Sequence, residues 1–318
     1  MSVPVASGNL HRGLDEAFDR ETRVSGIWRD TGRNIIHQRN AIVGIIILAF
    51  MILVAVFADQ ISTYQPNEVL LGVVPGAAKS SAPCIHLLGC PASQPEFLMG
   101  TDPNVRDEFS RVVHGARVSL FVGLVVVGGA ILLGSLIGLI AGYAGGWTDN
   151  ILMRLMDVLL VFPALLLAIG IVTAIGQGLL QAQLAITIVA IPIYARIMRA
   201  SVLATKEGDF ITASRALGEG SRGILFRRLL PNSVTPLIVA GTLGIAAAVL
   251  DVAALSFLGL GASPPTAEWG SMIGLDSGKL FTAPHLILFP GLFLTLTVFA
   301  FNLLGDGLRD ALDPRLNR

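Results

Sequence analysis

Residues 209–231, DFITASRALGEGSRGILFRRLLP, form a polar, basic and helix-prone stretch between two long apolar segments. Within it, four residues recur at i, i+3, i+4 and i+7, the spacing of one face of a helix. These residues are Phe210, Ala213, Ser214 and Leu217. Asp209 is the expected N-cap, Gly218 the expected C-terminal break and Pro231 the expected end of the segment. A chain that only spanned a membrane would not need this stretch, so we interpret it as a docking helix for a partner outside the membrane.

The composition is that of a membrane protein. The 318-residue chain has 53% apolar and 14% charged residues, a mean hydropathy of +0.72 and no net charge. A soluble domain carries about 25% charged residues. The chain is therefore predicted to be a polytopic, all-α membrane protein. Its neutral charge, without a basic run that contains aromatic residues, gives no support to nucleic-acid binding.

Six apolar segments are long enough to cross a bilayer. They are residues 41–58, 118–142, 151–176, 179–195, 237–260 and 286–304. The first could also be a signal peptide, but the region before it is too long, so a retained anchor is favoured. The predicted units are an N-terminal tail (1–40), a first transmembrane helix (41–58), an external loop (59–117), a five-helix core (118–305) and a C-terminal tail (306–318).

Orientation follows from the positive charges, because Lys and Arg concentrate on the cytoplasmic side of membrane proteins. Most of the 22 Lys and Arg residues lie in the two tails and in residues 196–236. Both termini and the 209–231 helix are therefore predicted to be cytoplasmic. The loop that holds Cys84 and Cys90 is predicted to be external, where a disulfide can form. A disulfide and two unpaired thiols both remain open, and a zinc site with His86 is disfavoured because too few ligands are near.

Several breaks and close contacts are expected around the spans. A strip of small residues lets another helix approach closely, and packing within this subunit is favoured over packing against another. The strip consists of Gly134, Gly138 and Gly142. Three prolines are expected to kink their helices; they are Pro163, Pro192 and Pro290. Residues 107–118 are expected to form an amphipathic helix before the second span, residues 145–150 a short turn, and residues 261–285 a polar loop.

No catalytic constellation is present. The sequence lacks the motifs G-x-x-x-x-G-K-[ST], H-E-x-x-H and G-x-S-x-G, and its five histidines are dispersed over tails and loops. We therefore predict a chain that is not an enzyme, with no catalytic, cofactor-binding or metal-binding residues of its own.

Asp251 is the one acidic residue well inside a predicted span. A carboxylate at the centre of a bilayer costs about 2.5–3.5 kcal/mol on insertion scales. It must therefore face a water-filled path, find a partner or be protonated. A pathway-lining role and a simple interhelical hydrogen bond are both open at this point.

The 209–231 segment resembles the EAA loop of ABC importer membrane subunits. The likeness is carried by Thr212-Ala213-Ser214, then Gly218, then Leu230-Pro231. Thr212 stands where that family usually has Glu, and Ser214 where it has a second Ala. In the family this loop is a cytoplasmic coupling helix that sits in a cleft of the ATPase subunit.

Further motifs resemble the C-type subunit of oligopeptide and dipeptide permeases. Residues 100–117 look like its GTDxxGRD…SR…GAR signature, with Val105 in place of the usual Gly. Residues 141–163, 255–261, 264–270 and 301–316 look like the same subunit, so the likeness covers residues 99–318 in order.

This resemblance implies a type I ABC importer permease with six transmembrane helices in the cell membrane. The implied partners are a B-type permease subunit, two ATPase subunits that bind ATP and Mg²⁺, a substrate-binding protein and a peptide substrate, in contact with membrane lipid. The implied coupling residues are Phe210, Thr212, Ala213, Ser214, Leu217, Gly218, Leu230 and Pro231. The same family also imports nickel, glutathione and other small solutes. A secondary transporter or channel, or a scaffold without transport, would leave the 209–231 helix unexplained.

Overall fold

The computed structural model describes residues 38–312, and the regular elements of this part are helices, apart from two isolated β-bridges in the loop before the second span. Five helices are long and apolar enough to cross a membrane, and a bent pair can supply a sixth crossing. The five are α3 (Arg39–Val56), α5 (Glu108–Ala144), α8 (Leu179–Thr205), α12 (Thr235–Phe257) and α14 (His285–Leu312). The predicted all-α membrane fold is confirmed. Most of the predicted N-terminal tail (1–40) lies outside the described residues, which begin at residue 38. The predicted C-terminal tail (306–318) lies outside them from residue 313 onwards.

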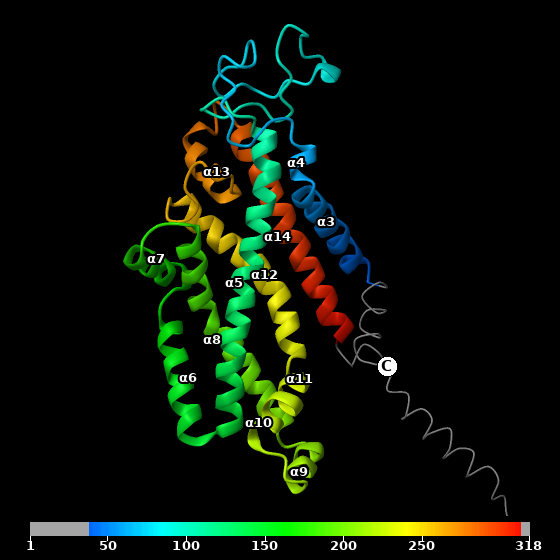
Figure 1. The fold of residues 1–318 in the computed structure, drawn as a ribbon, viewed down its shortest axis with the longest axis vertical. Helices are drawn as coiled ribbons and strands as arrows, with labels where there is room; N and C mark the ends of the chain where they lie inside the picture. The colour runs from blue at the N-terminus through cyan, green and yellow to red at the C-terminus, as the bar shows by residue number, and fades with distance from the viewer. Residues whose placement is uncertain (1–37, 313–318) are drawn as a thin grey trace, which may run out of the picture.

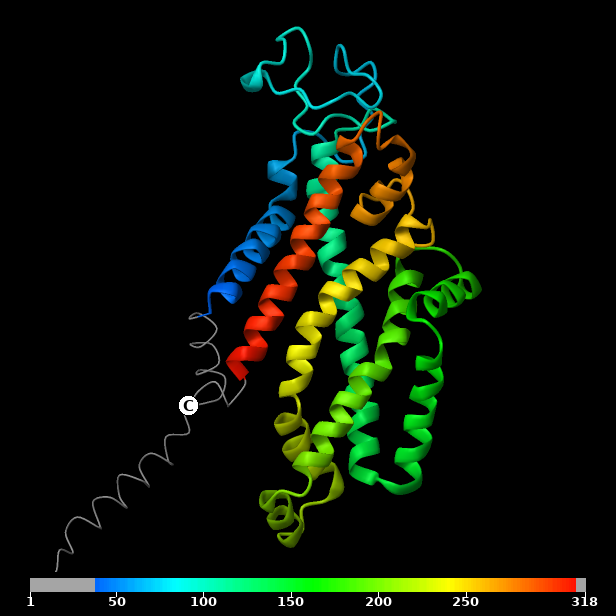
Figure 2. The ribbon, with the colours of Figure 1, turned by 180° about the vertical axis from the view of Figure 1, so that it is seen from behind.

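The helices form an elongated bundle with α5 running through its length (Figures 1 and 2). α8 packs along one side of α5, with α6 (Gly146–Val161) and α7 (Ala164–Ile175) beyond it, while α12, α14 and α3 follow on the other side. The end of the bundle that carries residues 209–233, between α8 and α12, is called the inner end. The loop between α4 (Ala58–Ile61) and α5 gathers at the opposite, outer end. The start of α3 and the end of α14 both point towards the inner end (Figure 1).

α5 is longer than a membrane crossing requires, because it has 37 residues and a span needs about 20. Asp107 caps its N-terminus by accepting a hydrogen bond from the Ser110 backbone N–H at 2.9 Å. The predicted amphipathic helix and the predicted second span are therefore one continuous helix. The turn predicted over residues 145–150 is shorter in the structure: it consists of Gly145 alone, and α6 begins at Gly146.

The glycine strip of α5 lies against α8 of the same chain, as predicted. A Cβ built on Gly138 would overlap the Ala195 carbonyl oxygen, and one on Gly134 would come 2.8 Å from the Ile191 carbonyl oxygen. Only residues without a side chain allow the two backbones this approach.

The third predicted span is broken rather than kinked. α6 and α7 meet at 93° across Phe162 and Pro163. Phe162 is extended (φ −85°, ψ 141°), because the ring of a following proline disfavours the helical conformation. Pro192 and Pro290, by contrast, lie inside the continuous helices α8 and α14.

The loop predicted over residues 261–285 is partly helical and partly buried. It contains α13 (Trp269–Asp276), and Trp269 is fully buried. The Trp269 Nε1 donates to the Val112 carbonyl at 2.9 Å, and its ring lies where a Cβ on Gly115 would be. A short 3-10 turn, η1 (His86–Leu88), lies in the outer loop, and another, η3 (Ser277–Lys279), follows α13.

Replacing Gly138 with alanine should loosen the α5–α8 contact. The added methyl overlaps the α8 backbone, and such overpacking costs about 1–3 kcal/mol. Gly128→Ala is the matched control, because nothing lies within 4 Å of a Cβ there. We expect a lower melting temperature in detergent for Gly138→Ala alone; equal melting temperatures for the two variants would contradict this packing.

Candidate functional site

The 209–231 segment folds as a compact helical hairpin at the inner end. Its first helix, α9 (Asp209–Ala216), is followed by α10 (Ser221–Gly223), a π-helical turn η2 (Ile224–Leu229) and α11 (Leu230–Ser233). Gly208, and not Asp209 as predicted, is the N-cap of α9, and no side chain makes a cap hydrogen bond. The break at Gly218 is confirmed: this residue has φ +81°, which glycine adopts without strain.

The end of α9 has a tight hydrogen-bonded cap. The Gly218 N–H donates to the Arg215 carbonyl and the Glu219 N–H to the Ser214 carbonyl, both at 3.0 Å. This pair of bonds is a Schellman motif and satisfies carbonyls that a helix end otherwise leaves free. The Glu219 carboxylate accepts a hydrogen bond from Arg228 Nε at 3.1 Å, and this ion pair connects the two arms of the hairpin.

Apolar anchors hold the hairpin to the bundle. Ile211, Ile224 and Leu229 are 0–2% exposed and belong to the core formed with α5, α8 and α12. Ser233 adds a contact at the base of the hairpin, with its Oγ 3.4 Å from Thr205 Oγ1 at the end of α8. The hairpin is therefore packed against the ends of α8 and α12.

The outward side of α9 is apolar and open. Phe210 is 44% exposed and Leu217 is 88% exposed, with Ala213 exposed between them and Thr212 beside them. Ser214 does not share this face, contrary to prediction: it is buried, and its Oγ donates to the Phe210 carbonyl at 2.9 Å. The helix is only two turns long, and burial of Ile211 rotates Ser214 inwards.

Pro231 does not end the segment as predicted. The helical path continues to Ser233, because the preceding turn is π-helical and the Leu230 N–H bonds to the Leu225 carbonyl. Proline near the start of α11 has no N–H to leave unsatisfied. Leu230 packs on the core and Pro231 is exposed, so both lie on the second arm and away from the α9 face.

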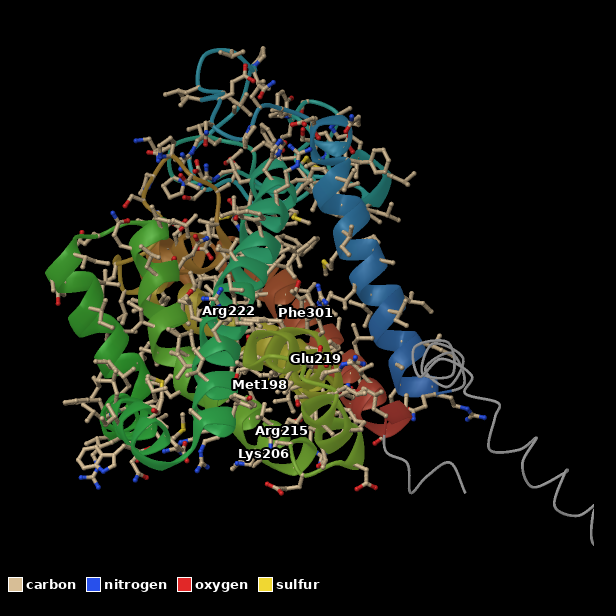
Figure 3. The ribbon with its side chains drawn as sticks, turned by 60° about the horizontal axis from the view of Figure 1, so that its bottom comes forward. Met198, Lys206, Arg215, Glu219, Arg222 and Phe301 are labelled. Carbon is tan, nitrogen blue, oxygen red and sulfur yellow. A yellow bond between two sulfur atoms is a disulfide. The ribbon has the colours of Figure 1, made fainter. Side chains whose placement is uncertain are left out.

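Basic residues surround this hairpin (Figure 3). Arg215 lies over the Tyr143 ring at 5.9 Å, and Lys206 Nζ donates to the Gly142 carbonyl at 3.2 Å. Figure 3, in which the inner end comes forward, places both side chains there with Arg222. These contacts join the hairpin to the end of α5.

Asp251 lines a cavity of about 150 Å³ between α6, α7, α8 and α12. The walls are mostly apolar and include Phe162, Ile193 and Ala247, with Tyr194 as the other polar side chain. The Tyr194 hydroxyl occupies the space where a Cβ on Gly244 would be, so the glycine makes room for it. A carboxylate is thus placed beside an open space in the middle of the bundle.

The residues of the GTDxxGRD-like motif form a buried ionic clamp at the outer end. The Asp102 carboxylate receives Arg106 Nε and Nη2, each at 2.6 Å, and Arg111 Nε lies 3.8 Å away. All three residues are less than 9% exposed. Val105, between them, has φ +60°, a conformation that glycine adopts without strain and that is rare for a β-branched residue.

Arg111 connects the clamp to two distant segments. Its Nη1 donates to the Pro66 carbonyl at 3.1 Å and to the Pro265 carbonyl at 3.3 Å. Arg117, one turn and a half further along α5, donates to the Ala55 and Val56 carbonyls at the end of α3. The motif therefore holds the outer loop, α3 and the α13 region on α5, a structural role.

Two buried carboxylates cap helices near this clamp. Glu268 accepts hydrogen bonds from the backbone N–H groups of Gly270 and Ser271 at the start of α13. Burial raises the pKa of the Glu268 carboxyl, and these hydrogen bonds oppose the rise. Burial likewise raises the pKa of Asp107, against its bonds from Ser110.

The two cysteines are joined in a disulfide, with Cα atoms 5.4 Å apart. The Cys84 backbone pairs with Phe97 in one of the two isolated bridges. Within residues 38–312 no group of three or more His, Cys, Asp or Glu side chains is placed to hold a metal ion.

Comparison with known proteins identifies the family. Residues 134–318 match the family described as binding-protein-dependent transport system inner membrane component, and residues 26–77 match the N-terminal TM domain of oligopeptide transport permease C. The chain belongs to this permease family. The dipeptide transport system permease protein DppC of Alkalihalophilus pseudofirmus is 43% identical over 298 residues, covering 94% of this chain and 93% of that protein.

Other relatives carry related names. The di/tripeptide transport system permease protein DppC of Pseudomonas aeruginosa is 42% identical and covers 88% of this chain and 89% of that protein. The glutathione transport system permease protein GsiD of Pectobacterium atrosepticum is 39% identical, with 93% and 94% covered. A solved structure of the MetNI methionine ABC transporter matches with a TM-score of 0.49 at 21% identity, over 63% of this chain and 96% of that one.

Membership makes this chain a multi-pass inner-membrane permease of an ABC importer, and not its catalytic subunit. ATP is bound by the ATPase partners of such importers, and a binding protein is a further partner. The sequence analysis identifies the 209–231 segment, but not its anchors Ile211, Ile224 and Leu229. Their signal was present as apolar residues outside the chosen helix face.

Neutralising Asp102 should destabilise the outer end. Asp102→Asn leaves Arg106 and Arg111 buried without a carboxylate, and breaking a buried ion pair from one side costs about 3–5 kcal/mol. We expect a lower melting temperature and faster protease cleavage in residues 62–107. Glu68→Gln, at an exposed position, is the control. A variant as stable and protease-resistant as this control would rule out the clamp.

Proposed function

We propose that this chain is the C-type permease subunit of an ATP-driven importer of dipeptides and short oligopeptides. The observation that carries the proposal is the exposed apolar face of α9 on a hairpin anchored to both α8 and α12. Relatives named for dipeptide transport, at 40–43% identity, support the peptide substrate.

The proposed complex contains a homologous B-type permease, two ATPase subunits that bind ATP and Mg²⁺, and an external substrate-binding protein. The α9 hairpin faces the cytoplasm and the disulfide-bonded loop faces outwards. Phe210, Ala213 and Leu217 dock into the ATPase, with Thr212 at the rim. ATP-driven closure then displaces α9, and its anchors turn α8 and α12 together.

Reconstituted proteoliposomes test the substrate. We expect the complex with its partners to take up a radiolabelled dipeptide only when ATP is present on the side of the membrane where the ATPase subunits lie. Glutathione and Ni²⁺ serve as competing substrates, because a relative of similar identity is named for glutathione transport. Uptake of glutathione or Ni²⁺ with no uptake of dipeptide would refute the peptide assignment.

Gly218→Pro should uncouple the ATPase. Proline requires φ near −65°, but Gly218 has φ +81°, so the cap of α9 cannot form. We expect the variant to insert in the membrane yet lose ATPase binding or ATP-coupled uptake. Gly220→Pro is the matched control, because Gly220 has φ −69° and open space around it. Full transport by Gly218→Pro would remove the docking role.

We also propose that Asp251 lines the pathway and contacts the substrate. Hydrogen bonds to charged groups contribute about 1.5–3 kcal/mol. Asp251→Asn is therefore expected to lower dipeptide uptake about tenfold or more with assembly intact, because about 1.4 kcal/mol corresponds to tenfold. Measured initial rates that are unchanged for every candidate substrate would leave Asp251 a packing residue.

A further inference from the structure

A groove lined by charged side chains runs between α6 and α8 on the inner half of the bundle. It encloses about 720 Å³. Its charged residues are Asp149, Arg154, Asp157, Arg196 and Arg199. Two ion pairs cross it from α8 to α6: Arg196 Nη2 lies 2.7 Å from Asp157 Oδ1, and Arg199 Nε lies 2.5 Å from Asp149 Oδ1.

The Asp157–Arg196 pair lies at the depth of the apolar part of α5. Gly138, inside the 118–142 apolar stretch, packs against Ala195 and Met198 of α8, the neighbours of Arg196 in the chain. Both charged side chains are nevertheless about half exposed, at 57% for Asp157 and 52% for Arg196. Charged groups at such a depth face a water-filled space or a protein partner rather than lipid.

The groove and the Asp251 cavity lie next to each other along α6 and α8. Leu160 lies one helical turn from Asp157 on α6, and Ile193 lies one turn from Arg196 on α8; both line the Asp251 cavity. A single surface of α6 and α8 thus leads from Asp251 to the inner end. Trp147, 82% exposed, lies at its inner limit.

We infer that Asp157 and Arg196 form a binding pair for zwitterionic substrates in the inner half of the pathway. This inference rests on the proposed peptide-import function. The ammonium end of the substrate pairs with Asp157, and its carboxylate end pairs with Arg196 and Arg154. Within the part of the chain that the structure describes, Arg154 has no ion-pair partner, so its charge is available.

The charge balance selects the substrate class. Separating Asp157 from Arg196 leaves each side chain without its opposite charge, at a depth where a lone charge is costly. A zwitterion supplies both opposite charges at once, so each side chain exchanges one partner for another. A solute with only one charge would leave a side chain unpaired, and a neutral solute would leave the pair closed. The pair therefore opens most readily for a molecule with both an ammonium and a carboxylate group.

Cysteine labelling in the reconstituted complex tests whether the groove is part of the pathway. Met153 lines the groove and Leu155 does not, and both native cysteines of this chain are held in the disulfide. We expect Met153→Cys to react with a charged thiol reagent added on the inner side. The reaction should become several-fold slower when a zwitterionic dipeptide is being transported. Leu155→Cys, about 200° around α6, should not react.

Uptake by two further variants tests the pair itself. Asp157→Asn and Arg196→Gln are each expected to lower uptake of a zwitterionic dipeptide about tenfold, with the ATPase subunits still bound. Amidating the dipeptide carboxylate removes the partner of Arg196, so Arg196→Gln should then change uptake less than Asp157→Asn does.

Several outcomes overturn the inference. Variants that transport at the wild-type rate, or that lose their partner subunits, would show a pair without a substrate role. A loss that depends on the anionic-lipid content of the vesicles, with Met153→Cys unreactive, would show a lipid-headgroup site. If the wild-type complex transports no peptide, the proposed function fails as well; if only the variants behave as wild type, the proposed function stands and this inference falls.

Discussion

The close approach of α5 and α8 is the contact on which the rest of the bundle depends. Three glycines of α5 bring the two backbones together, and no larger residue fits at Gly138. α8 is the helix that leads into the 209–231 hairpin, and it also forms one wall of both the Asp251 cavity and the α6–α8 groove. A rigid α5–α8 pair therefore connects the hairpin mechanically to the polar residues in the middle of the bundle. Separation of the pair would shift all of these features at once.

The two ends of α5 are held by different kinds of interaction. At the outer end, the buried Asp102–Arg106–Arg111 clamp and Trp269 join the helix to the outer loop and to α13. At the inner end, Arg215 of the hairpin lies over the Tyr143 ring and Lys206 at the end of α8 donates to the Gly142 carbonyl, beside the apolar anchors Ile211, Ile224 and Leu229. Buried, multiply bonded charges resist displacement more than surface contacts do. The outer end is thus held by buried ionic contacts, and the inner end by apolar packing and weaker polar contacts. In the proposed mechanism the inner end is the part that moves.

The sequence was enough to predict the helical membrane fold, a short helix within residues 209–231 and its break at Gly218, because these follow from local properties: apolar length, helical period and glycine. What it could not supply depended on distant neighbours. Pro163 predicts a break in the helix, but the size of the bend depends on how α7 packs against α8. Ser214 is turned inwards because Ile211, one turn before it, is buried in the core. The helical path continues past Pro231 because the π-helical turn before it shifts the backbone hydrogen bonds. The motif over residues 100–117 was recognisable, but its role as a clamp required the long-range contacts of Arg111 and Arg117.

The distribution of charge also separates structural residues from those suited to transport. Asp102, Arg106 and Arg111 are buried and satisfied by one another, so they have no free capacity for a substrate. Asp251, Asp157 and Arg196 lie beside open space, and each sits at a depth where an unused charge would be costly. All three are on helices connected to the 209–231 hairpin, directly or through α8. Asp157 and Arg196 compensate each other in the ion pair. In the proposed mechanism, a zwitterionic ligand replaces both partners during passage, which gives a reason for keeping such charges on these helices.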